Sequence, residues 1–70
     1  MMLKPFISVC VAIYNVDKYL DKCLKSLEEQ KIQNVEFILV DDCSTDKSVT
    51  ICEKFCKKDN RFRLIRHEKI

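Results

Sequence analysis

The sequence of 70 residues contains no glycine at all. This absence argues against a Walker phosphate loop and against the glycine-rich dinucleotide fingerprint, because both need glycine where the backbone approaches a phosphate closely. P-loop NTPases, kinases and NAD-binding Rossmann units are therefore poor interpretations of the chain. The single histidine, His67, lies near the end of the chain, and no Ser-His-Asp order is visible.

Long apolar runs and strong charge are also missing. No run of 18 apolar residues is present, so we expect no membrane-spanning helix. The amino end lacks the pattern of a secretory signal, which favours a cytoplasmic protein; a peripheral place at the inner face of the membrane stays open for a complete protein. The net charge is +2, with 13 basic and 11 acidic residues mixed along the chain, which argues against nucleic acid as a partner.

Cysteine is abundant for this length, with five residues: Cys10, Cys23, Cys43, Cys52 and Cys56. A secreted disulfide framework is one interpretation, but it would leave one thiol over. Zinc binding needs close pairs of ligands, and only the last two cysteines are one helical turn apart. We therefore predict that the thiols are small buried apolar residues in a reducing compartment.

The first half of the chain alternates between strand and helix patterns. Residues 6–13 are apolar on both alternating faces, which is typical of a strand buried from both sides in a parallel sheet. Residues 17–30 have the spacing of an amphipathic helix, with Asp17 as its predicted amino cap. A polar connection over 31–34 leads to a second strand, predicted over 35–41.

A second helix is predicted from Thr45 to Lys57, with Ser44 as its cap and Asp46 in its first turn. Its apolar stripe consists of Val49, Cys52, Phe55 and Cys56. Asp59 and Asn60 break the pattern, and residues 62–65 form a short third strand.

The predicted fold class is α/β, with the order β-α-β-α-β. Right-handed crossovers in the strand order 3-2-1 place both helices on one face of the sheet. The other face is left uncovered although its residues are apolar. We therefore predict that residues 1–70 are the amino-terminal part of a larger domain, and that the uncovered face permits self-association.

The segment 37–46 is the most informative stretch, because an apolar strand runs directly into Asp41 and Asp42. In open α/β sheets, ligands bind at the carboxyl ends of strands. A matching strand end at Tyr14 and Asn15 lies upstream. These carboxylates could accept hydrogen bonds from a base or sugar, or bind a metal ion. Alternatively, one of them caps the next helix and the other is solvated.

The neighbouring polar and aromatic residues also have two interpretations each. The ring of Tyr14 could stack on a nucleobase or pack over the first helix. Asn15 could bind a ligand or satisfy backbone groups of the turn, and Asp46 is predicted to support its helix. Arg61, Arg63 and Arg66 could neutralise phosphates; Arg61, Arg63 and His67 are assigned to the surface by default.

Three segments together resemble the beginning of family-2 glycosyltransferases with the GT-A fold. They are the strand 7–15 ending in Tyr-Asn, the helix with Tyr19-Leu20 and Cys23-Leu24, and the segment Asp41-Asp42-Cys43-Ser44-Thr45-Asp46. In this family the last segment reads Asp-Asp-Gly-Ser-Thr-Asp. The resemblance covers nearly the whole chain and implies a Rossmann-like, three-layer nucleotide-diphospho-sugar transferase fold in the complete domain.

The resemblance implies that this part of the enzyme binds the nucleotide of the sugar donor. Ala12 and Tyr14 would line the nucleobase site, and Asn15 would shape the turn beneath the nucleotide. Asp42 would accept the imide proton of the base, and Asp41 would support that strand end. An acceptor at this point suits uracil, so a UDP-sugar is the expected donor.

Two positions depart from the family pattern: Cys43 replaces the usual glycine, and Ala12 stands where proline is frequent. The Asp-x-Asp motif that binds Mg²⁺ or Mn²⁺, the catalytic base and the acceptor site lie downstream in the family. We therefore expect no catalytic or metal-binding residue in 1–70 and no transferase activity of this chain alone. A glycan or lipid-linked acceptor for polysaccharide, lipopolysaccharide or glycoprotein assembly belongs to the complete enzyme; a non-catalytic nucleotide-binding module and a truncated remnant remain the alternatives.

Overall fold

The computed structural model describes residues 7–67 of the chain. Strands and helices alternate along them in the order β1 (Ile7–Ile13), α1 (Asp17–Glu28), β2 (Val35–Asp42), α2 (Ser48–Lys58) and β3 (Phe62–His67). The predicted β-α-β-α-β order is confirmed. Phe6, which was included in the predicted first strand, lies outside the described residues.

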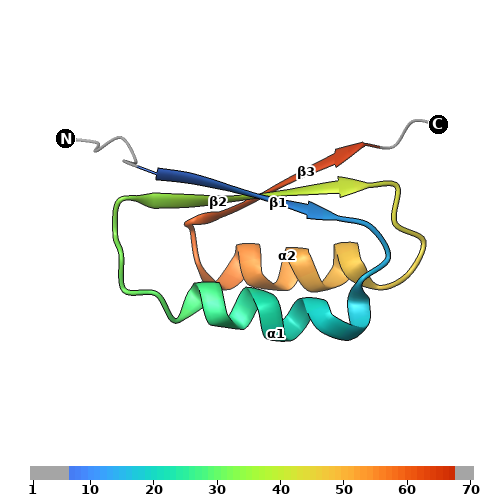
Figure 1. The fold of residues 1–70 in the computed structure, drawn as a ribbon, viewed down its shortest axis with the longest axis horizontal. Helices are drawn as coiled ribbons and strands as arrows, with labels where there is room; N and C mark the ends of the chain where they lie inside the picture. Colours follow the sequence, from blue (N-terminus) through green and yellow to red (C-terminus); the bar gives the residue numbers. More distant parts are fainter. Residues whose placement is uncertain (1–6, 68–70) are drawn as a thin grey trace.

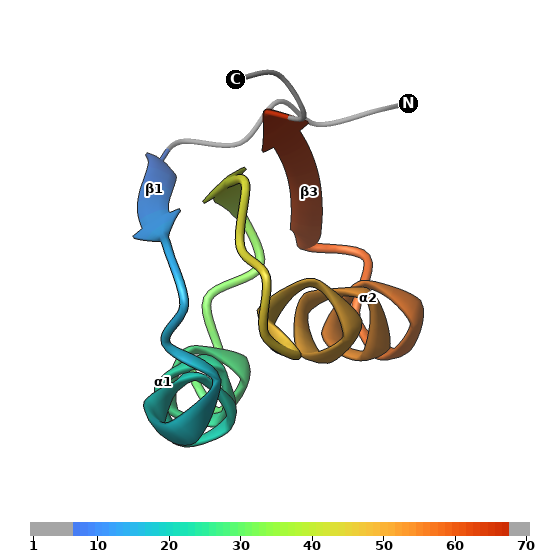
Figure 2. The same ribbon diagram turned by 90° about the vertical axis from the view of Figure 1, so that its right-hand side faces the viewer.

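The strands form one parallel sheet in the order β1-β2-β3. Both crossovers run in the same direction across the sheet, so their common handedness places both helices on one face. Figures 1 and 2 show α1 and α2 side by side along that face. No described element covers the opposite face, as the strand order predicted. The described residues thus form two layers of the three expected for a complete domain.

The hydrophobic core lies between the sheet and the helices. Alternation along β2 turns Val35, Phe37 and Leu39 toward the helices, where all three are buried. The Phe62 ring lies between two others, with its centroid 4.9 Å from that of Phe37 and 5.7 Å from that of Phe55. Aromatic contacts at these separations stabilise a core beyond the area that they bury.

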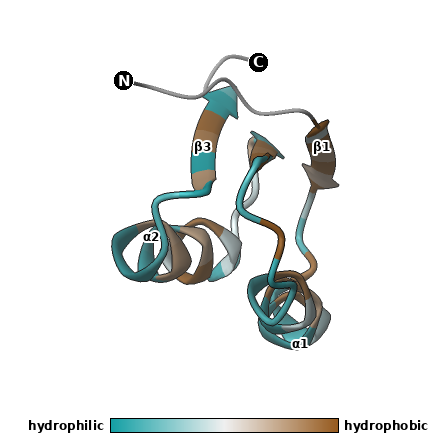
Figure 3. Ribbon diagram, turned by 90° about the vertical axis from the view of Figure 1, so that its left-hand side faces the viewer, coloured by the Kyte–Doolittle hydropathy of each residue, from teal (hydrophilic) through white to brown (hydrophobic). Residues whose placement is uncertain are grey.

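The opposite face, which we call the open face, carries the alternate residues of each strand. Figure 3 shows that β1 is hydrophobic, yet Ser8, Cys10 and Ala12 are exposed along it. The prediction that this strand is buried from both sides is therefore wrong for the described residues, because no second layer packs on it. The apolar open-face residues Ile38, Val40 and Ile65 lie alongside on β2 and β3.

The cysteines do not share one environment. Cys52 is fully buried, and burial raises the pKa of its thiol to about 12, so it is unreactive at neutral pH. Cys10 and Cys23 are exposed instead, which corrects the prediction that all the thiols are buried. Cys10 lies on the open face, and Cys23 lies on the side of α1 that borders the outer edge of β1.

Several predicted boundaries moved by a few residues. Asp17 is the first residue of α1 rather than its cap, and the residues at the two N-cap positions, Val16 and Lys47, form no side-chain capping bond. The second helix begins at Ser48, so Ser44 is not its cap and Asp46 precedes its first turn. The physical reason is that the side chains of Asp17, Ser44 and Asp46 accept backbone N–H groups of the neighbouring turn. His67 is the last residue of β3 rather than part of a tail.

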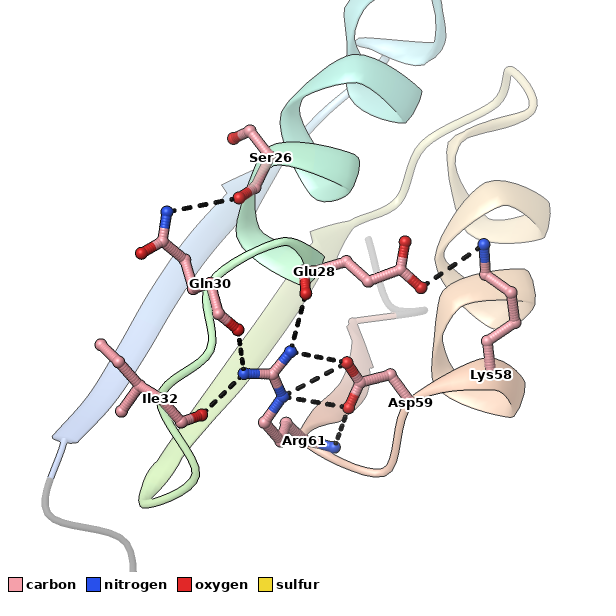
Figure 4. Close-up of polar contacts among 7 residues, drawn as sticks. All are labelled: Ser26, Glu28, Gln30, Ile32, Lys58, Asp59 and Arg61. Carbon is pink, nitrogen blue, oxygen red and sulfur yellow. Dashed lines mark hydrogen bonds and ion pairs between the residues drawn. The ribbon is translucent and has the colours of Figure 1, made fainter.

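Arg61 is a structural residue, which corrects its assignment to the surface. Its guanidinium donates to the backbone carbonyls of Glu28, Gln30 and Ile32 at 2.9, 2.8 and 2.7 Å (Figure 4). It also pairs with the carboxylate of Asp59 at 2.8 Å. The last carbonyls of a helix have no partner within it, and Arg61 supplies these donors to the end of α1 and the loop after it.

Candidate functional site

The carboxyl ends of β1 and β2 meet at one edge of the sheet, beside the amino ends of both helices (Figure 1). Pairing in register places Ala12 beside Val40 and Ile13 beside Asp41. Tyr14 and Asn15 directly follow the end of β1, and Asp42 ends β2. The structure therefore brings all five predicted site residues to the same edge.

Asp42 lies on the open face and is available to solvent. Its side chain is 73% exposed, and its Oδ1 lies 4.0 Å from Nδ1 of His67, its partner in the register of β2 and β3. A carboxylate in this place can accept a hydrogen bond from a molecule that lies over the sheet edge.

Asp41 faces the helices and is buried, with 2% exposure. Its Oδ2 accepts the backbone N–H of Ser44 at 3.1 Å. Its Oδ1 is buried and has no hydrogen-bond partner among the described residues. The two adjacent carboxylates thus have different tasks: Asp42 is accessible to a ligand, whereas Asp41 holds the turn that follows β2.

Tyr14 is accessible at the same edge. The residue is 61% exposed, so it is not buried against α1. The apolar groove between β1 and α1, about 230 Å³ in volume, is lined by Tyr19 instead. Ala12 is exposed on the open face beside β2. An exposed ring that follows the strand carrying this small side chain is available for a planar group to stack on.

Two residues of this edge have left-handed backbone conformations. Asn15 has φ of 48° and Cys43 has φ of 60°, and they are the non-glycine residues with positive φ in the described part of the chain. Asparagine tolerates this region well, whereas a residue such as cysteine pays for its Cβ there. The glycine of the family pattern at position 43 is explained by this conformation.

The turn after β1 (15–17) and the loop after β2 (44–48) are joined through Asn15. Its Oδ1 accepts the backbone N–H of Thr45 at 2.7 Å and that of Asp46 at 3.3 Å. Its own N–H donates to Oγ of Ser44 at 3.0 Å. Asn15 therefore satisfies backbone groups of the turn, which was one of the two interpretations of its type.

Three further hydrogen bonds extend this connection. The N–H of Val16 donates to Oγ of Ser48 at 3.1 Å, and the N–H of Asp17 donates to Oδ2 of Asp46 at 3.1 Å. In return, Oδ2 of Asp17 accepts the N–H of Lys47 at 3.2 Å. We call the bonds between 15–17 and 44–48 the inter-turn latch. Sequence reasoning missed Asp17 and Ser48 as its members, because no local pattern shows partners about 30 residues apart.

The electrostatics of Asp46 follow from this geometry. Partial burial opposes ionisation, but the hydrogen bonds that its carboxylate accepts from Ser48 and Asp17 outweigh this and lower its pKa. Asp46 is thus held as an anion that accepts backbone N–H groups from both sides of the latch.

The arginines do not form one phosphate-binding cluster. Arg61 lies at the opposite end of α1 from the latch, and Arg63 pairs with Glu36 at 3.6 Å while its side chain is 70% exposed. Arg66 alone of the three lies in register with Asp41, near the site. Within residues 7–67, no group of three His, Cys, Asp or Glu side chains is placed to hold a metal ion. No helix in this range is long and apolar enough to cross a membrane.

Comparison with known proteins gives consistent matches over this chain. The sequence profile described as Glycosyl transferase family 2 matches residues 8–69. Glycosyltransferase GlyG of Streptococcus pneumoniae serotype 4 is 48% identical over 66 residues, which are 94% of this chain and 22% of that protein. The putative glycosyltransferase EpsH of Bacillus subtilis is 45% identical over 67 residues, which are 96% of this chain and 20% of that protein.

A solved structure shares the fold. A mannosyltransferase from Pyrobaculum calidifontis, in complex with GDP-Man and Mn²⁺, superposes with a TM-score of 0.81 and 21% sequence identity, over 97% of this chain and 21% of that chain. The chain thus spans about a fifth of the length of these proteins. The likeness confirms the GT-A, Rossmann-like architecture that the sequence predicted.

Proposed function

The chain belongs to glycosyl transferase family 2, and on this premise we propose that the sheet edge described above binds the nucleotide end of a sugar-nucleotide donor. Tyr14 stacks on the base over Ala12, Asp42 accepts a hydrogen bond from it, and Asn15 shapes the turn beneath the nucleotide. The observation that carries this proposal is that Tyr14 and Asp42 are both exposed at one sheet edge, while Asp41 is turned inward to support it.

The proposed base is uracil, so that the donor is a UDP-sugar. The N3–H of uracil is a donor that matches the carboxylate of Asp42, whereas N3 of cytosine is an acceptor that the carboxylate would repel. Leaving a polar group without its partner under a bound base costs about 1–3 kcal/mol. A carboxylate that faces the ring N3 therefore favours uracil, whose N3 carries a hydrogen, over cytosine, whose N3 does not.

The activity proposed for the longer protein is transfer of the donor's sugar to a glycan or lipid-linked acceptor in polysaccharide, lipopolysaccharide or glycoprotein assembly. Mg²⁺ or Mn²⁺ would neutralise the donor diphosphate there. The described residues do not fit this metal, since they contain no suitable group of ligands. Because the chain spans only about a fifth of the length of the relatives that it matches, we expect it to bind the nucleoside end weakly and to transfer no sugar by itself.

Calorimetric titration with UDP, CDP and GDP tests the base assignment. We expect UDP to bind more tightly than CDP by about tenfold, since a matched hydrogen bond at this strength corresponds to about 1.4 kcal/mol. Asp42→Asn should reduce this preference, because an amide can also donate to cytosine. Glu29→Gln is the control, since Glu29 is exposed and directly follows α1, at the opposite end of this helix from the sheet edge.

Equal binding of UDP and CDP, or a preference unchanged in Asp42→Asn, would contradict the role of Asp42. Tighter binding of GDP than of UDP would replace uracil by guanine, which also presents an N–H. Failure of all three nucleotides to bind a folded chain would overturn the nucleotide site itself.

The open face is the surface through which we expect copies of this chain to associate. Cys10 and Ile65 are exposed on this face, and Ile38 and Val40 are half-buried. No layer among the described residues covers them. Sedimentation equilibrium should show concentration-dependent association, and Val40→Lys should weaken it because a charge opposes burial of that face. A monomer at all concentrations would contradict this expectation.

A further inference from the structure

The inter-turn latch fixes the residues that carry the proposed nucleotide site. Tyr14 stands directly before Asn15, whose φ of 48° is held by bonds to the second turn. Asp46 accepts a hydrogen bond from the N–H of Asp17, which lies two residues after Asn15. The conformation of the chain beside Tyr14 is therefore set by groups that lie about 30 residues away.

We propose that Asp46 is a positioning residue for nucleotide binding, acting through the latch without contact with the nucleotide. This inference rests on the proposed function and deepens it. The carboxylate orders the first turn so that Tyr14 and Asn15 are preformed for the base. Because a site that is formed only part of the time binds more weakly by that fraction, loosening the latch lowers the apparent affinity.

Both oxygens of the Asp46 carboxylate are used in hydrogen bonds, which makes one substitution at this residue informative. Both oxygens of Asp46 accept backbone N–H groups, Oδ1 from Ser48 at 2.9 Å and Oδ2 from Asp17 at 3.1 Å. Asp21 is exposed on α1, four residues after Asp17, and is not part of the latch. An asparagine has one acceptor oxygen and one donor group on its amide.

Asp46→Asn must therefore turn an amide donor toward a backbone donor, and it breaks one bond of the latch. Asp21→Asn leaves every bond of the latch in place. Both changes remove one negative charge near the amino end of α1. They therefore separate the hydrogen bonding of the latch from simple charge.

The test is titration of the wild-type chain and these two variants with UDP and with uridine, followed by amide chemical shifts. We expect Asp46→Asn to weaken binding of both ligands by about tenfold, corresponding to a tenfold loss of the competent population, and Asp21→Asn to change it by less than about twofold. A purely electrostatic role would instead strengthen UDP binding in both variants and leave uridine unchanged.

A second measurement on the wild-type chain does not depend on the folding of any variant. If the nucleotide binds the latched state, saturating UDP should slow hydrogen exchange of the Asp17 and Ser48 amides, which donate to Asp46. Unchanged exchange at both amides would overturn the proposal. So would equal affinities of the wild-type chain and Asp46→Asn.

The outcomes distinguish this inference from the one on which it rests. If the wild-type chain binds UDP and Asp46→Asn binds it equally, only the positioning role is overturned. If the folded wild-type chain binds neither ligand, the nucleotide site and the positioning role fail together.

Discussion

Arg61 and Asp59 lie two residues apart in the sequence and form an ion pair of 2.8 Å, with side chains that are only 15% and 16% exposed. The same guanidinium donates to three carbonyls at the end of α1 and in the following loop (Figure 4). One side chain thus joins the entry of β3 to the exit of α1, at the end of the molecule opposite the latch.

Replacing Arg61 should therefore destabilise the chain strongly. We expect Arg61→Lys to lower the free energy of unfolding by about 2 kcal/mol, because an ammonium cannot replace the fork of donors that meets a carboxylate and several carbonyls. Urea denaturation measures this. Arg63→Lys is the matched control, since the exposed pair with Glu36 should be worth less than about 0.5 kcal/mol. Equal losses in the two variants would show that Arg61 does not hold this junction.

The acid stability of the chain should depend on Asp59. Hydrogen bonds from Arg61 lower the pKa of this carboxyl below 3.8, although burial opposes the shift. A depressed pKa in the folded state contributes stability that is present above the unfolded value and is lost as pH falls through the folded value. We expect the free energy of unfolding to decline below about pH 4, and to decline less steeply in Asp59→Asn. An identical pH dependence in this variant would count against the pairing.

The backbone at Cys43 should prefer glycine. The residue has φ of 60°, and its thiol donates to the carbonyl of His67 at 2.8 Å. Because only a Cβ makes this conformation costly, we expect Cys43→Gly to be more stable than Cys43→Ala by about 1 kcal/mol. Both variants lose the thiol, so thermal unfolding of the pair isolates the backbone term. If the alanine variant were the more stable one, the conformation described for this turn would be wrong.

Stacking on the base should depend on Tyr14 rather than on exposed tyrosine in general. Loss of an aromatic platform costs about 1–3 kcal/mol per base, so Tyr14→Ala should weaken UDP binding by about tenfold. Tyr19 is 73% exposed on α1, and Tyr19→Ala should leave the affinity within about twofold of the wild type. Fluorescence or calorimetric titration compares them, and equal losses would remove the special role of Tyr14.

The sequence was sufficient to predict the alternating elements, the parallel sheet and the places where its strands end, because each depends on local patterns; the strand order was an assumption that the structure confirms. The apolar strand that runs into Asp41 and Asp42 predicted a strand end there, and the crossover rule placed both helices on one face. The different tasks of the two carboxylates also follow from alternation along β2, with Asp41 turned inward and Asp42 outward.

The latch and the Arg61 junction could not be predicted in the same way. Ser44 and Asp17 are good helix caps by type, but each accepts a backbone N–H of the neighbouring turn instead, from Asn15 and Lys47 respectively. Arginine is by type a surface residue, and only the folded chain brings the free carbonyls at the end of α1 within hydrogen-bonding distance of Arg61. Such partners are set by tertiary packing, which local propensity does not contain.

The most direct test of the proposed nucleotide site is titration of the chain with UDP, followed by backbone amide shifts, in the presence and absence of Mn²⁺. The structure predicts saturable shifts at Tyr14, Asn15 and Asp42 that do not require the metal, and no shift in the connection 31–34 at the opposite edge of the sheet. A dispersed spectrum in which Tyr14 and Asp42 do not shift, or in which 31–34 shift instead, would contradict it.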